Sequence, residues 1–191
     1  VSGSITVNIP NYRGFHVRPS TLLSKIVIHY GGNVKMTLHD QVYDASMPLE
    51  LFRANELINS EKRMYAGQEI MKHHLIKKLK INKVSPDEMR KKLRIIFLDL
   101  LEQKTILIYE NSFSFEGLDP VDDENLIDYV KRAITTYLAL GKIDISSKMT
   151  VTFTGDRRVL KDIQILAENG YGEDLFGNNI VLPSELSYLR R

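Results

Sequence analysis

The 191-residue sequence predicts an α/β fold of the α+β type, with strands and helices near both ends and a mainly helical segment between them. Residues 4–10 and 149–153 alternate apolar and polar side chains, which is the period of a half-buried strand. Apolar residues at helical spacing follow each of these two segments. The middle of the chain instead combines helical spacing with many charged residues.

The composition excludes several classes of protein. With 43% hydrophobic residues the chain can bury a core, and without Cys it has no disulfide framework, thiol nucleophile or cysteine-based zinc site. No apolar run approaches the roughly 18 to 20 residues of a membrane-spanning helix. The first residues lack the basic and apolar regions of a signal peptide. We therefore expect a cytoplasmic protein with no membrane insertion and no bound cofactor.

The first part of the chain alternates strands and helices. After the strand at 4–10, Pro19 fits the first turn of a helix, where its missing N–H has no intrahelical partner in any case. Residues 34–38 and 42–44 alternate again around a turn, which predicts two paired strands. Ser46 is a candidate N-cap for the helix that follows.

The middle of the chain predicts three helices. Residues 61–81 place four apolar residues on one helical face among many lysines: Met64, Met71, Leu75 and Leu79. Ser85 and Pro86 form a strong helix start, and residues 122–124 start another helix. Residues 105–109 between these helices are a short strand or a helix tail.

Strand and helix patterns return near the C-terminus. The strand at 149–153 ends in a turn at 154–156, and a helical stripe follows up to Asn169 and Gly170. Residues 175–191 combine turn residues with a short helix after a proline, which predicts a tail docked on the body of the protein.

The small net charge of +2 conceals two oppositely charged segments. Residues 61–94 hold 11 Lys or Arg against 4 acidic residues, and residues 99–128 hold 9 acidic residues against one Lys. We expect two solvated faces, of which the basic one is a candidate partner surface. The overall charge is too small to indicate a nucleic-acid-binding protein.

One group of residues between the first strand and the first helix can carry chemistry. His16 is expected at the helix N-terminus, where unpaired backbone N–H groups and the positive end of the helix dipole favour an anion. Arg18 supplies a planar fork that pairs with phosphate oxygens. A neutral imidazole can also act as a nucleophile. These residues predict either a phosphoryl-accepting site or a histidine that only caps the helix.

The run Gly-Phe-His-Val-Arg-Pro-Ser-Thr-Leu-Leu at residues 14–23 resembles the active-site motif of the histidine-containing phosphocarrier protein (HPr) family of the bacterial phosphotransferase system. The resemblance extends through residues 33–51, where Ser46 stands at the place of the serine that starts the family's second helix. It implies an open-faced β-sandwich with a four-stranded antiparallel sheet and three helices. Their expected order is strand, helix, strand, strand, helix, strand, helix.

The family is much shorter than this chain, so its last strand and helix must lie further along. Residues 149–156 supply the strand, and residues 166–174 resemble the family's C-terminus. The expected parts are an HPr-like domain at 1–54 and 146–174, a helical insertion at 55–145 and a C-terminal tail at 175–191. The alternative is a degenerate carrier at 1–82 followed by a separate domain.

The resemblance implies a phosphoryl relay rather than an enzyme. It implies that His16 accepts a phosphoryl group from the phosphoenolpyruvate-dependent general enzyme and passes it to a sugar-specific acceptor protein. Arg18 is then expected to steady the group, with the backbone N–H groups of Val17 and Arg18 as further donors. Ser46 becomes a candidate for phosphorylation by a regulatory serine kinase. The resemblance also assigns four residues to binding: Pro19, Ser20, Met47 and Leu51.

The surplus length leaves a second function open. In this alternative the chain is a regulatory binding module with the HPr fold, and the insertion at 55–145 docks a protein partner. We expect no metal site among the other histidines. His29 and His39 are expected at the surface, and the adjacent His73 and His74 are expected on different sides of a helix.

Overall fold

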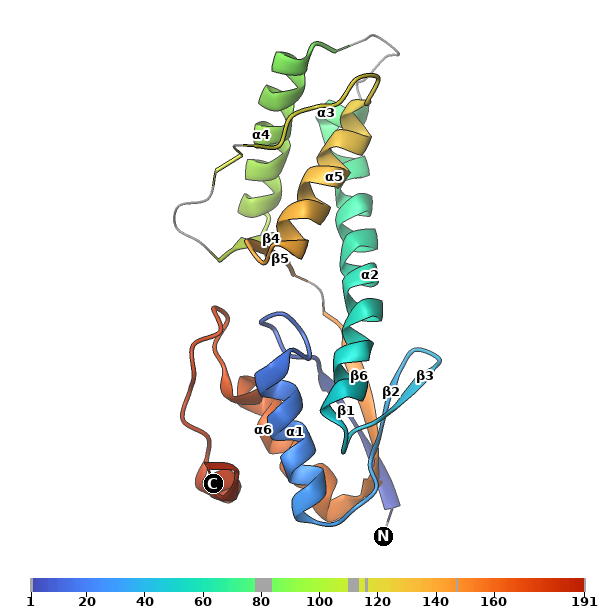
Figure 1. Cartoon of the computed structure of the whole chain (residues 1–191), viewed down its shortest axis with the longest axis vertical. Helices are drawn as coiled ribbons and strands as arrows, with labels where there is room; N and C mark the ends of the chain where they lie inside the picture. The colour runs from blue at the N-terminus through green and yellow to red at the C-terminus, as the bar shows by residue number, and fades with distance from the viewer. Residues whose placement is uncertain (1, 78–83, 110–113, 116, 147, 191) are drawn as a thin grey trace. The chain divides into compact units, whose positions relative to one another are not determined.

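The structure is a computed structural model that describes residues 2–77, 84–109, 114–115, 117–146 and 148–190 (Figure 1). The chain divides into two compact units. Unit 1 comprises Val1–Asn59 and Lys148–Arg191, and unit 2 comprises Ser60–Ser147. The expected boundary between residues 54 and 55 falls inside helix α2 (Pro48–Lys72), which contributes residues to both units.

Unit 1 is built on a four-stranded antiparallel sheet, which confirms the expected mixed α/β class. The order of its strands is β1 (Ser2–Asn8), β6 (Thr150–Asp156), β2 (Lys35–Leu38) and β3 (Gln41–Asp44). Phe153 of β6 stands opposite Ile5 of β1 and Met36 of β2. Because Phe153 and Met36 are fully buried, the sheet joins the two ends of the chain through one apolar core.

Helices α1 (Val17–His29) and α6 (Arg157–Glu168) lie side by side against this sheet (Figure 1). Each buries an apolar stripe at helical spacing, as the sequence predicted. Asp156 caps α6, because its carboxylate accepts the Arg158 N–H at 2.8 Å. These two helices bring the N-terminal and C-terminal segments of unit 1 together beside the first loop.

The start of α2 differs from the prediction. The helix begins at Pro48, so its N-cap position falls on Met47 rather than Ser46. The Ser46 hydroxyl donates to Asp44 Oδ1 at 2.7 Å, and the Ser46 N–H donates to the same oxygen at 3.0 Å. These two bonds lower the pKa of Asp44. The prediction of Ser46 as an N-cap is therefore wrong, because its side chain joins a local turn before the helix.

The C-terminal tail packs into unit 1. The 3₁₀ segments η1 (Gly170–Gly172) and η2 (Ser184–Arg190) follow α6. The hydroxyl groups of Tyr30 and Tyr188 both donate hydrogen bonds to Asp162 Oδ2 at 2.7 Å. The bond from Tyr30 to Asp162 raises the pKa of Tyr30 to about 12. Three leucines of the tail are buried in the same core as the sheet: Leu182, Leu186 and Leu189.

Unit 2 is mainly helical and also contains a small sheet. Helix α4 (Pro86–Glu102) begins at the predicted cap, where Ser85 Oγ accepts the Glu88 N–H at 3.3 Å. Strands β4 (Ile106–Ile108) and β5 (Ile143–Ile145) pair in antiparallel fashion. Residues 105–109 thus contain a strand, whereas β5 was not predicted. A three-residue strand is too short for its alternation to stand out from its neighbours.

Two other helices of unit 2 differ from their predicted bounds. Helix α5 (Leu126–Ala139) has Asn125 as its N-cap, so it begins after the predicted start at 122–124. The predicted helix at 61–81 is divided, because α2 ends at Lys72 and a short helix α3 (His74–Lys77) follows. The last residues of the predicted helix, which include Leu79, lie outside the described residues. No helix in the described part of the chain combines the length and apolar character that a membrane span requires.

Candidate functional site

A short loop after β1 sets the backbone of His16 at the start of α1. Gly14 has a φ of +61°, and a Cβ there would lie 2.6 Å from Asn55 Oδ1, so this position needs glycine. The same Asn55 oxygen accepts the Phe15 N–H at 2.8 Å. Ser20 Oγ donates to the Phe15 carbonyl, also at 2.8 Å. These contacts hold the residue before the histidine from two sides.

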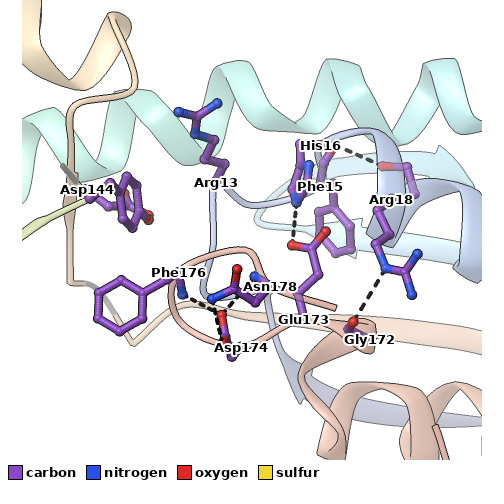
Figure 2. A network of polar contacts seen from close by, with 12 residues as sticks. Arg13, Phe15, His16, Arg18, Asp144, Gly172, Glu173, Asp174, Phe176 and Asn178 are labelled. Atoms are coloured by element: carbon purple, nitrogen blue, oxygen red, sulfur yellow. Dashed lines mark hydrogen bonds and ion pairs between the residues drawn. The ribbon is translucent and has the colours of Figure 1, made fainter. Parts of the chain in front are cut away.

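His16 is the N-cap residue of α1, and its ring faces Glu173. The His16 Nε2 atom lies 2.8 Å from Glu173 Oε2 (Figure 2). The Glu173 side chain is 4% exposed and the His16 side chain 24% exposed. Because a carboxylate only accepts hydrogen bonds, Nε2 carries the proton, and in the neutral ring Nδ1 keeps the lone pair. The geometry therefore leaves Nδ1 as the ring nitrogen with a lone pair that accepts no proton from Glu173.

Arg18 and the first N–H groups of α1 are hydrogen-bond donors of the kind that suits an anion. Val17 and Arg18 are the first two residues of the helix, so their N–H groups precede the first intrahelical donor. That donor is the Ser20 N–H, which reaches the His16 carbonyl at 3.2 Å. Arg18 Nε donates to the Gly172 carbonyl at 3.4 Å (Figure 2). The two Nη atoms of the guanidinium supply further donors of the kind that pair with phosphate oxygens.

A tight turn holds the segment that supplies Glu173. The Asp174 carboxylate accepts the Asn178 N–H at 2.9 Å, and this bond is the main reason why the pKa of Asp174 is lowered. Gly177 has a φ of +82°, and a Cβ there would lie 2.5 Å from the Tyr12 ring. The Tyr12 ring in turn lies edge-on to the imidazole, with ring centroids 5.3 Å apart. The turn after Glu173 thus packs against an aromatic neighbour of the histidine.

The structure separates the expected binding residues into exposed and buried ones. Val17 is 68% exposed beside His16, and Met47 is exposed at the N-cap position of α2. Pro19 and Ser20 are buried residues within the first turn of α1. Leu51 is fully buried in the core of unit 1, so its side chain does not reach the surface expected for it.

The structure brings His73 and His74 together, so the expectation that they lie on different sides of a helix is wrong. The helix breaks at this point, and the two rings stack with centroids 4.4 Å apart. Together with Asp99, they form a group whose ligand atoms all lie within 4.8 Å of one another. The Leu75 N–H donates to His73 Nδ1 at 3.1 Å.

This hydrogen bond fixes the proton of a neutral His73 ring on Nε2, which lies 2.6 Å from Asp99 Oδ2. A metal at Nε2 needs the proton on Nδ1, where it would bond an outer acceptor. The Leu75 N–H already occupies that place. The geometry therefore favours a His73–Asp99 hydrogen bond over a metal site.

Two residues that sequence reasoning missed complete the site around His16. Asn55 comes from the second turn of α2, and Glu173 is 157 residues away from His16 in the chain. The resemblance of residues 166–174 to the end of the HPr family was a signal that this segment belongs to unit 1. It gave no indication that the Glu173 carboxylate bonds the imidazole.

Comparison with protein-family models, with curated proteins and with solved structures gives no match to this chain.

Proposed function

We propose that the chain is a phosphocarrier of a phosphoenolpyruvate-dependent sugar phosphotransferase system, with unit 1 as an HPr-like domain. One observation carries the proposal: the 2.8 Å bond between His16 Nε2 and Glu173 at the N-terminus of α1. This bond leaves Nδ1 as the ring nitrogen with a lone pair. The nearby helix N-terminus and Arg18 favour the anionic group that such a nitrogen would accept.

Phosphoryl transfer to His16 depends on positioning and on charge. The Nδ1 lone pair attacks phosphorus, and the Nδ1–P bond forms while the bond between phosphorus and the donor atom breaks. The electron pair of the broken bond leaves with the donor. Arg18 and the first N–H groups of α1 stabilise the phosphoryl oxygens. Glu173 stabilises the positive charge that develops on the ring, because the Nε2 proton stays bonded to its carboxylate.

The order of elements in unit 1 supports an HPr-like domain. Along the chain, unit 1 contains β1, α1, β2, β3, the start of α2, β6 and α6. This is the order that the resemblance at residues 14–23 implies. Unit 2 begins within α2 and ends before β6, and the surplus length was expected in this part of the chain.

The proposed partners are the general phosphotransferase enzyme and a sugar-specific acceptor protein. Exposed apolar side chains that such partners can contact lie next to His16 and at the start of α2: Val17, Met47 and Leu49. Ser46 is a second candidate for phosphorylation, by a regulatory serine kinase. A phosphate on Ser46 would stand beside the Asp44 carboxylate, and the repulsion between them would alter the turn before α2.

The test is incubation of the full chain with labelled phosphoenolpyruvate and the general enzyme. We expect acid-labile phosphate on the wild type and none on His16→Ala. His29→Ala is the matched control, because His29 is exposed on the same helix, and it should be labelled like the wild type. An unlabelled wild type, or a His16→Ala variant that is still labelled, would overturn the proposal.

A further inference from the structure

A groove lies on the surface of unit 2, between α2 and α5. Its volume is about 680 Å³, and it is lined by eight residues of α2 between Arg63 and Lys72 and by Lys131, Ile134 and Thr135 of α5. All these residues belong to unit 2, whereas His16 and the residues around it belong to unit 1.

The floor and walls of the groove are apolar because α2 has apolar residues on two of its sides. Ala66 and Ile70 are buried and contribute to the core of unit 2. Met64 and Met71 lie outside this core, and 62% and 46% of their surface is exposed. Both methionines line the groove. Gly67 lies between these two methionines on the same face of α2 and adds no side chain there.

Methionines at this spacing fit a helical partner. Met64, Gly67 and Met71 stand at positions i, i+3 and i+7 of one helix, which is the spacing of a continuous helical face. Unbranched and polarisable methionine side chains adapt to the apolar face of a docked helix. An isolated exposed methionine needs no explanation, but two methionines on one helical face of the same groove offer an extended apolar surface.

The charged side chains that line the groove are all cationic. Three cationic side chains line the groove: Arg63, Lys72 and Lys131. The described lining residues include no carboxylate. Lys72 also pairs with Glu69 at 3.0 Å on the exposed surface of α2. The Lys131 side chain passes over Gly67, with its Cε atom 3.6 Å from the place of a Cβ. Cations therefore stand on both helices that form the groove.

We propose that this groove binds an acidic amphipathic helix of a partner protein. Apolar side chains of the partner at i, i+3 or i+4, and i+7 would pack against Met64 and Met71, on either side of Gly67. Carboxylates on the flanks of that helix would pair with Arg63 and Lys131. A nucleic acid offers phosphates to the rim but no aliphatic side chains to the apolar floor, so the floor favours a peptide.

The test uses the full chain and three synthetic peptides in a fluorescence anisotropy titration. The first peptide is helical, with leucines at i, i+3 and i+7 and glutamates on its flanks. The second has lysines in place of the glutamates, and the third has the composition of the first in scrambled order. We expect saturable binding of the first peptide only. No binding of the first peptide, or equal binding of the scrambled one, overturns the proposal.

Two variants locate the binding site on the protein. Gly67→Leu fills the middle of the groove and should raise Kd at least ~10-fold, and Lys131→Glu should raise it by about 3-fold to 10-fold. Lys91→Glu is the matched control, because it makes the same charge change on the exposed surface of α4 and should leave Kd unchanged. Circular dichroism of each variant verifies that it is folded.

Peptide binding that survives both groove variants overturns the proposal. So does binding of a DNA duplex or of anionic lipid vesicles that depends on Gly67 while the acidic peptide fails to bind.

Discussion

The buried ion pair of unit 2 gives a stability prediction whose size follows from its geometry. Lys62 Nζ lies 2.9 Å from Asp144 Oδ1, and both side chains are only 3% exposed. At an effective dielectric constant near 20, the attraction over this distance is about 6 kcal/mol. Desolvation costs several kcal/mol for each ion, so the intact pair contributes little net stability.

Removal of one partner of this ion pair is strongly destabilising, because it leaves the other charge buried without a counter-charge. Lys62→Met should destabilise unit 2 by about 3 to 5 kcal/mol, and Asp144→Asn should have a cost of similar size. Oδ1 of Asp144 also accepts the Ile145 N–H at 2.8 Å, and Oδ2 accepts the Tyr109 hydroxyl. The single asparagine oxygen can retain the bond from Ile145, and the asparagine NH₂ group can donate to the Tyr109 oxygen instead. The Lys62→Met/Asp144→Asn double variant should therefore lose much less stability than the sum of the two single variants.

Amide hydrogen exchange in peptides from β5 and α2 measures the loss of stability within unit 2. A local measurement is needed because a chain of two units need not unfold in one step. A loss of 3 kcal/mol corresponds to exchange that is ~100-fold faster. Lys91→Met is the control at an exposed position and should change exchange little. If the single variants exchange like the wild type, or if their effects simply add in the double variant, the reasoning about the buried pair is refuted.

Three further predictions concern unit 1. Gly172→Ala should destabilise the unit by about 1 to 3 kcal/mol, because Gly172 has a φ of +84° and a Cβ there would lie 2.9 Å from a leucine of α1; thermal unfolding measures this loss. Ser46→Ala should raise the pKa of Asp44 towards its ordinary value, since bonds from Ser46 hold that pKa low, and an NMR titration of Asp44 checks the direction. The stability that ionised Asp44 contributes is present above its unfolded-state pKa and is lost as the pH falls through the folded-state pKa, so this acid-sensitive contribution should shrink in Ser46→Ala. Glu173→Leu should remove the preference for a proton on Nε2 of His16, which ¹⁵N NMR of the imidazole measures. The same variant should slow phosphorylation of His16 by about 10-fold or more, which the rate of labelling measures.

The parts of the fold that the sequence predicted are those fixed by local rules. Pro19 in a first turn, the apolar stripes of α1 and α6 and the Ser85 cap of α4 depend on residues within a few positions of one another. The assignment of residues 149–156 to the same sheet as residues 4–10 required the resemblance, because no local pattern specifies which strand fills a gap left by an insertion. The place of β6 between β1 and β2 was not predicted.

The parts that were missed depend on contacts between distant or competing groups. Glu173 reaches His16 only because α6 returns the chain to the start of α1. The break after α2 follows from His73, whose ring accepts the Leu75 N–H and whose carbonyl accepts the Ile76 N–H. Helical periodicity cannot register a side chain that competes for backbone donors in this way.

The measurement that most directly tests the account is the site of phosphate attachment on the His16 ring. Wild-type protein labelled with ¹⁵N in histidine is incubated with phosphoenolpyruvate and the general enzyme, and ³¹P and ¹⁵N NMR then identify the phosphorylated nitrogen. Because Glu173 holds Nε2 as an N–H donor, we predict a phosphorus–nitrogen bond at Nδ1 of His16. A phosphate on Nε2, or the absence of any phosphohistidine, would contradict the account.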